Sequence, residues 1–123
     1  MKFKKAPQEL IDFLMEKMKG KNCDYKKMFG YPAFFINGNM FTGVFADQLF
    51  LRLSDMDQEE ISKQYSDVVP LEPMKGRPMK SYVVLPKSLY ADSKVFDDLL
   101  FKSMMYTSEL PVKKGKPSKA KMY

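Results

Sequence analysis

Residues 28–53 read MFGYPAFFINGNMFTGVFADQLFLRL, and this stretch decides the fold. Its middle holds Asn37-Gly38 between two runs of aromatic and β-favouring residues. Asn-Gly is a strong signal for a two-residue hairpin, because both central residues of a type I′ turn need a positive φ. With this dipeptide as the turn, the sequence predicts three cross-strand pairs: Ile36 with Asn39, Phe35 with Met40, and Phe34 with Phe41.

A second chain reversal is expected at Asp47-Gln48. This turn predicts three further pairs across the strands: Ala46 with Leu49, Phe45 with Phe50, and Val44 with Leu51. The two hairpins together form a three-stranded antiparallel meander. One face of this meander is apolar and therefore needs a cover.

Two segments outside the meander have the patterns of helices. Residues 7–19 begin with proline, carry apolar side chains at i, i+3 and i+4 spacing, and are followed by Gly20, a residue type that often ends a helix. Residues 54–65 have Ser54 or Asp55 as a cap and several acidic residues in the first turns. Few residues of this second helix are apolar, so we expect it to cover the sheet only shallowly.

The rest of the body supplies short strands and a last helix. Strands are expected at 24–29, 68–69 and 82–85. Residues 71–81, LEPMKGRPMKS, contain two prolines and one glycine, which favour a loop or an irregular sheet edge.

The last helix is expected from about Ser88, or from Ser93 after a kink, to Met105. The element order is then α-β-β-β-β-α-β-β-α. This order predicts an α+β fold in which an antiparallel sheet, the meander plus one or two short strands, is flanked by about three helices. No glycine-rich turn from strand to helix indicates a nucleotide site.

Composition limits the class of protein. The chain has 123 residues, 45% of them hydrophobic and 14% aromatic, which predicts one folded body with its own core. No apolar run is long enough for a membrane span, so no membrane association is expected. Acidic residues at positions 9, 12 and 16 interrupt the N-terminal segment, which argues against a signal peptide. We therefore expect a cytoplasmic protein.

The chain has no histidine and only one cysteine, Cys23. Ser–His and Cys–His catalytic pairs are therefore excluded within one chain, and the commonest metal ligand is missing. A lone cysteine fits a reducing compartment. Because Cys23 follows the electronegative end of a helix, we expect an inert thiol. The sequence thus predicts no enzyme, no catalytic residue, no metal and no cofactor.

The net charge of +6 is concentrated at one end of the chain. Residues 110–123 carry five lysines and no acid, whereas residues 1–109 carry 16 basic and 15 acidic side chains and are nearly neutral. The predicted organisation is a folded domain at 1–109 and a disordered tail at 110–123. The lysines of the tail are Lys113, Lys114, Lys116, Lys119 and Lys121. They either contact nucleic-acid phosphates or keep the chain soluble. We favour the second alternative, because no aromatic residues are interleaved with these lysines to stack on bases.

The segment 75–82 is the candidate interaction surface of the body. Basic residues near a sheet edge suggest a small anion site, although glycine and proline here are also explained by turn geometry alone, which we favour. The residues of this surface are Lys75, Arg77, Met79, Lys80 and Tyr82.

The chain is rich in methionine, which fills irregular cores and also lines adaptable contact surfaces. Core filling is expected for Met28 and Met40. Met74 and Met79, in the expected loop, are better candidates for a contact surface.

Several of these residues together carry a family resemblance over roughly residues 25–101. The matching pieces, in chain order, are Lys27-Met28-Phe29-Gly30, Asn37-Gly38 with Met40-Phe41, the run DQLFLRL at 47–53, Gly76-Arg77-Pro78-Met79, and Tyr82 with Pro86. This combination resembles the N-terminal domain of the TfoX/Sxy family, whose members are linked to bacterial competence. The resemblance implies a layered α+β fold, often as a single domain, and no catalytic residues.

The chain departs from the family pattern in two places. Gly30-Tyr31-Pro32 stands where the family commonly has a Gly-Gly-Tyr-Gly-like run. Only the lysine-rich tail stands where full-length competence regulators carry a second domain.

Two functions are open at this point. The first is a non-enzymatic protein-interaction domain, regulatory in role, that offers a sheet edge or loop to an unknown protein partner or to a second copy in a homodimer. The second is a protein that binds nucleic acid non-specifically through its tail. An enzyme of unrecognised type is the third and least favoured alternative.

Overall fold

The computed structural model describes residues 5–28, 30–74, 76–112 and 121–122, with the side chains of 73, 74, 77, 78, 80, 121 and 122 left out. The helices are α1 (Gln8–Met18), α2 (Asp55–Gln64), α3 (Lys87–Tyr90) and α4 (Ser93–Ser108). The strands are β1 (Asp24–Met28), β2 (Tyr31–Ile36), β3 (Asn39–Phe45), β4 (Gln48–Arg52), β5 (Val69–Met74), β6 (Arg77–Leu85) and β7 (Lys121–Met122). The predicted α+β class is confirmed.

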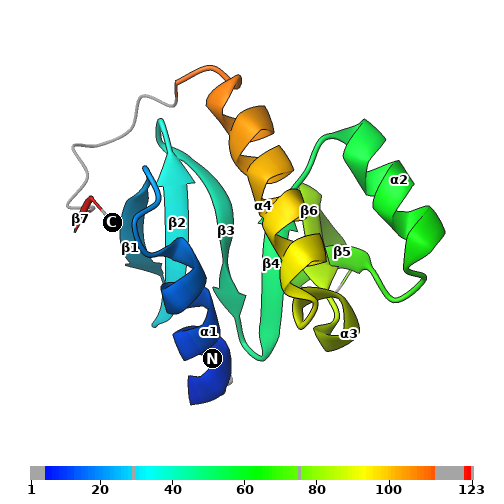
Figure 1. The fold of residues 1–123 in the computed structure, drawn as a ribbon, viewed down its shortest axis with the longest axis horizontal. Helices are drawn as coiled ribbons and strands as arrows, with labels where there is room; N and C mark the ends of the chain where they lie inside the picture. Colours follow the sequence, from blue (N-terminus) through cyan, green and yellow to red (C-terminus); the bar gives the residue numbers. More distant parts are fainter. Residues whose placement is uncertain (1–4, 29, 75, 113–120, 123) are drawn as a thin grey trace.

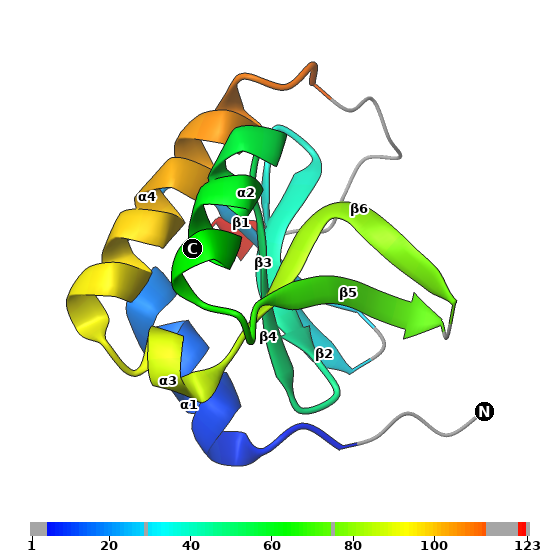
Figure 2. The ribbon, with the colours of Figure 1, turned by 90° about the vertical axis from the view of Figure 1, so that its right-hand side faces the viewer.

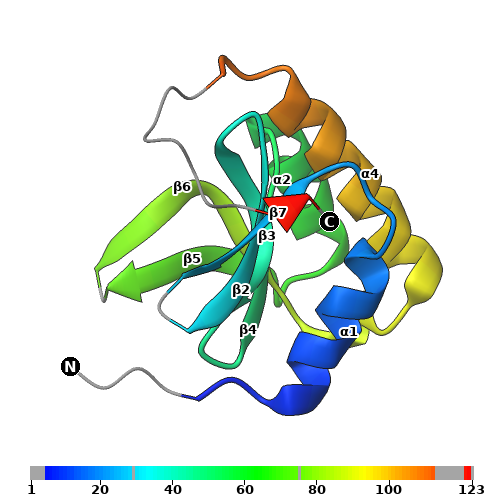
Figure 3. The same cartoon turned by 90° about the vertical axis from the view of Figure 1, so that its left-hand side faces the viewer.

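The strands form one sheet in the order β5-β6-β4-β3-β2-β1-β7, and all neighbours are antiparallel (Figure 1). The helices lie on one face of this sheet. The β5–β6 hairpin leaves the plane of the other strands and extends away from the helices, on the opposite side (Figures 2 and 3). The sheet therefore has a face covered by helices and a second face bounded by this hairpin.

The first hairpin turns at Asn37-Gly38, where both residues have positive φ angles of 53° and 81°. The predicted pairs of Ile36 with Asn39 and of Phe35 with Met40 are confirmed. The pairing of Phe34 with Phe41 is wrong, because the register shifts after Phe35 and Phe34 lies opposite Thr42. A β-bulge at Phe41 accounts for the shift, and it keeps Phe34 and Phe41 in the same buried core.

The second turn lies at Ala46-Asp47, one residue earlier than predicted. Ala46 has a positive φ of 55°, and Phe45 pairs with Gln48 instead of Phe50. The register differs from the predicted one by two residues, so every side chain stays on its expected face. The observed register places Phe50 opposite Gly43, where the large ring has room.

The predicted loop at 71–81 is wrong, because β5 and β6 form a hairpin here. Pro70 is tolerated because β5 is the edge strand and does not need every amide donor. Register shifts interrupt the β5–β6 pairing, and Ser81 has a positive φ of 83°. The segment is thus an irregular edge, as the alternative prediction stated.

The end of the chain contributes one short element. Lys121–Met122 pairs with Asp24 and Tyr25 of β1. Of the disordered tail predicted at 110–123, the structure otherwise describes only residues 110–112, and residues 113–120 and 123 lie outside the described residues.

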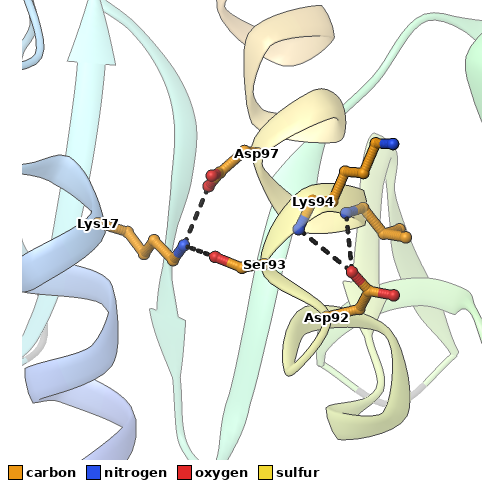
Figure 4. A network of polar contacts seen from close by, with 6 residues as sticks. Lys17, Asp92, Ser93, Lys94 and Asp97 are labelled. Carbon is orange, nitrogen blue, oxygen red and sulfur yellow. Dashed lines mark hydrogen bonds and ion pairs between the residues drawn. The ribbon is translucent and has the colours of Figure 1, made fainter.

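The helices begin and end close to their predicted positions. The Ser54 hydroxyl caps α2 by accepting a hydrogen bond from the amide of Asp57. The last helical segment breaks between α3 and α4, as the kinked alternative predicted. The Asp92 carboxylate caps α4 by accepting from the amides of Lys94 and Val95 (Figure 4).

Lys17 ties α1 to the start of α4. Its ammonium group donates to Ser93 Oγ at 2.6 Å and to Asp97 Oδ1 at 3.1 Å (Figure 4). The same group lies near the rings of Phe13 and Phe96. These contacts fix the two helices over the main core, which contains the largest fully buried side chains between the helices and the sheet.

A second, smaller cluster lies on the other face of the sheet. Phe50, Leu71 and Tyr82 form its buried part, and Met40 and Met79 are among the half-buried side chains packed against them. Among the described residues, no helix is long and apolar enough to cross a membrane.

Candidate functional site

An open groove of about 210 Å³ lies on the hairpin side of the sheet. Its lining is almost wholly apolar and comes from six strands: Met28, Tyr31, Ala33, Met40, Val44, Phe45, Phe50, Leu71 and Met79. We call this feature the hairpin groove.

The floor of the hairpin groove follows from the sheet register. Ala33 lies opposite Gly43, Gly43 lies opposite Phe50, and Phe50 lies opposite Val84. Residues paired in this way share one face of the sheet. Ala33 at one end of this row is small, and Gly43 beside it has no side chain, which leaves room for the ring of Phe50 to lie over Gly43. At the β2 and β3 positions of this row the floor therefore carries no bulky side chain of its own.

The walls combine rigid and adaptable side chains. The rings of Tyr31 and Phe45 meet edge to face at 5.5 Å between centroids. Met28, Met40 and Met79 are each half-buried. An unbranched thioether side chain repacks easily around different shapes. The groove can therefore adjust to an apolar group that enters it.

Polar groups gather at the Met40 end of the groove. The Tyr82 hydroxyl donates a hydrogen bond of 2.8 Å to the carbonyl oxygen of Met40 and accepts one of 3.3 Å from Arg52. The Arg52 guanidinium also lies 5.2 Å from the centre of the Tyr82 ring. Burial raises the pKa of the Tyr82 hydroxyl above its usual value of 10. Tyr82 thus remains a neutral donor at physiological pH.

Arg52 is incompletely satisfied by its protein neighbours. Its Nε atom is buried and has no hydrogen-bond partner in the part of the chain that the structure describes. Within the described part of the chain, the ion pairs of aspartate and glutamate involve lysines and not Arg52. A cation that is only partly solvated and lacks a carboxylate is suited to bind an anionic group.

This arrangement is suited to binding. The groove is smaller than the roughly 300–1,000 Å³ of pockets that enclose drug-sized ligands, so it matches one or two apolar side chains better than a whole cofactor. Within the described ranges, no cluster of three or more histidine, cysteine, aspartate or glutamate residues could hold a metal ion.

The structure places two residues of the predicted interaction surface, Met79 and Tyr82, at or beside the hairpin groove, and their role stays a prediction. Met79 lines the hairpin groove, and Tyr82 contacts two other lining residues, Met40 and Phe50. Arg77 and Lys80 belong to β6, but their side chains lie outside the described atoms, as does Lys75 entirely. The suggested anion site at these three residues stays a prediction.

The predicted tail contacts also fall largely outside the described residues. Lys113, Lys114, Lys116 and Lys119 are not described, and Lys121 is described only through its backbone in β7. Nucleic-acid contact by these lysines stays a prediction.

Sequence reasoning missed most of the groove. Met28 and Met40 were expected in the core, whereas both line the groove and are half-buried. The unpredicted lining residues are Tyr31, Ala33, Val44, Phe45, Phe50 and Leu71. The alternation of side chains along β3 and β4 shows which residues point away from the helices. It does not show that the β5–β6 hairpin bounds this face and turns it into a groove.

A second hollow of about 360 Å³ separates α2 from α4. Its walls carry charges of both signs, including the Lys102–Asp98 pair at 3.5 Å, above Ile61 and Leu99. This mixed lining gives no preference for a ligand of one charge.

The comparisons with known proteins identify the family of the chain. A family model described as the TfoX N-terminal domain matches residues 15–106, which is most of the chain. The chain therefore belongs to the TfoX N-terminal domain family, as the sequence motifs predicted. Searches of curated proteins and of solved structures found no match.

Proposed function

We propose that this chain is a non-enzymatic protein-interaction domain with a regulatory role, and that the hairpin groove is its docking surface. The observation that carries the proposal is an open, apolar groove edged by three adaptable methionines, Met28, Met40 and Met79. Methionine-rich apolar surfaces are typical of protein contacts. Membership of the TfoX N-terminal domain family supports the regulatory part of the proposal.

The size and lining of the groove support an apolar side chain as the group that binds. A volume of about 210 Å³ accepts a bulky side chain of a partner, and its burial there would stabilise the complex by about 1.5–3 kcal/mol. The absence of histidine from the sequence supports a role without catalysis.

The test compares two full-length variants as baits in pull-downs from the native cell. Met79→Gln places a polar group in the groove at nearly unchanged volume. Met105→Ala removes an exposed methionine from α4, away from the groove, and is the matched control. We expect a protein that the wild type and the control retain and that Met79→Gln loses. Equal recovery by all three baits would contradict the groove as docking surface.

The rival function is non-specific binding of nucleic acid through the tail. It is favoured by the five lysines and no acid in residues 110–123. Retention on immobilised DNA, with and without residues 110–123, separates the two functions. Salt-sensitive retention that needs the tail would support the rival, and negligible retention of both chains would eliminate it.

A further inference from the structure

The most exposed large apolar side chain in the described residues is Met56, at 77%. It lies in the first turn of α2, between Asp55 and Asp57. Glu59 and Glu60 follow three and four positions later, on the neighbouring surface of the helix. Met56 is thus an apolar side chain surrounded by carboxylates.

The hairpin groove has the opposite character. Its interior is apolar, and among the described residues no carboxylate forms an ion pair with Arg52 at its polar end. The β5–β6 segment, residues 69–80, has three basic residues and one acidic residue in its sequence, a net charge of +2. By contrast, α2 has four acidic residues and one lysine, a net charge of −3.

We propose that the hairpin groove binds Met56 and the acidic first turn of α2 from a second copy of this chain. The thioether enters the apolar groove, and a carboxylate beside it reaches Arg52 at the polar end. This inference rests on the proposed function, because it takes the groove to be a docking surface and names its occupant. Each copy carries both the groove and Met56, so two copies can bind each other reciprocally in a closed dimer.

Charge complementarity favours Met56 over the two exposed apolar residues of α4. Phe101 and Met105, 64% and 49% exposed, lie on α4 on either side of Lys102. A lysine beside the inserted side chain would face the positive end of the groove and repel it. The two lysines of α4 balance its two aspartates, whereas α2 carries a net charge of −3, so Met56 has the most negative surroundings of these three residues.

The experiment measures self-association of the full chain by analytical ultracentrifugation over a wide range of concentration. We expect the wild type to associate. Met56→Ala should weaken the association about tenfold or more, because it removes the buried apolar group. Met79→Gln should weaken it comparably from the groove side, and Met105→Ala, the control, should leave it unchanged. Added salt should weaken the wild-type association.

A mixing experiment identifies the contact. Met56→Ala keeps an intact groove, and Met79→Gln keeps an intact Met56. A mixture of the two variants should associate more strongly than either variant alone, because one complementary contact is restored. A monomeric wild type, or a mixture no stronger than the separate variants, would overturn the inference. If the wild type is monomeric while the pull-down still depends on Met79, the proposed function stands and only its occupant is wrong.

Discussion

The ring of Phe50 lies so close above Gly43 that a Cβ atom on this glycine would stand 2.9 Å from Phe50 Cζ. The same Cβ would stand 2.7 Å from the carbonyl oxygen of Pro32. Contacts this short do not occur, so the sheet accepts only glycine here without shifting. This pair of residues fits the register of β3 against β4, in which Gly43 lies opposite Phe50 and the ring covers the glycine.

We therefore expect Gly43→Ala to destabilise the fold by about 1–3 kcal/mol, because the backbone oxygen on one side cannot move away as a side chain could. Urea unfolding followed by circular dichroism measures the change. Lys26→Ala, at an exposed position of β1, is the control and should have little effect. An unchanged midpoint for Gly43→Ala would show that the close approach is absent.

The Tyr82 hydroxyl is expected to stabilise the polar end of the groove. Tyr82→Phe removes the 2.8 Å hydrogen bond to Met40 and one of the partners of Arg52. We expect a loss of about 0.5–1.5 kcal/mol in unfolding free energy. Chemical denaturation at neutral pH measures it. A variant as stable as the wild type would contradict the role assigned to this hydroxyl.

Cys23 should make stability fall in alkaline solution. Burial raises the pKa of its thiol from 9.0 to about 11. Between these values the folded chain holds a proton that the unfolded chain has lost, so the unfolding free energy falls as pH rises through this window. The expected loss by pH 11 is about 2–3 kcal/mol, since each pKa unit corresponds to about 1.4 kcal/mol.

Denaturation of Cys23→Ala against pH tests this expectation. The variant should lose less stability than the wild type between pH 9 and about 11. Parallel curves for the two proteins would contradict a buried, neutral thiol. Tyr82→Phe is a useful comparison, because the raised pKa of Tyr82 acts only above its usual value of 10.

Two fully buried threonines should respond in opposite ways to loss of the hydroxyl. Thr42 Oγ1 donates a 2.8 Å hydrogen bond to the carbonyl oxygen of Phe50, whereas Thr107 Oγ1 has no partner among the described residues. We expect Thr42→Val to destabilise by about 1 kcal/mol and Thr107→Val to be neutral or stabilising. Thermal unfolding of both variants decides it. The reverse order would contradict the hydrogen bonding described for these residues.

The sequence predicts those features of the fold that depend only on residues adjacent in the chain. Asn37-Gly38 located the first turn because its φ requirement is local. The second turn was misplaced by one residue, because it uses Ala46 at a positive φ, which no local rule favours. The observed register instead places Phe50 over Gly43, a contact between strands.

The β5–β6 hairpin was missed for a related reason. Prolines at 70, 73 and 78 argue against a central strand. Proline is tolerated more easily in a strand at the edge of a sheet. Whether a strand lies at the edge depends on the whole fold and is not visible in the local sequence. The hairpin groove was not predicted for the same reason. Its lining comes from β1 to β6, so only the tertiary structure brings Met28 and Met79 to one surface.

The central claim is that the hairpin groove is open and receives an apolar group. The most direct measurement is an NMR titration of the full chain, carrying ¹³C-labelled methionine methyl groups, with toluene as a small apolar probe. We expect the methyl signals of Met28, Met40 and Met79 to shift, while that of Met18, fully buried beneath the helices, stays in place. No shift at the three groove methionines, or an equal shift at Met18, would contradict the claim.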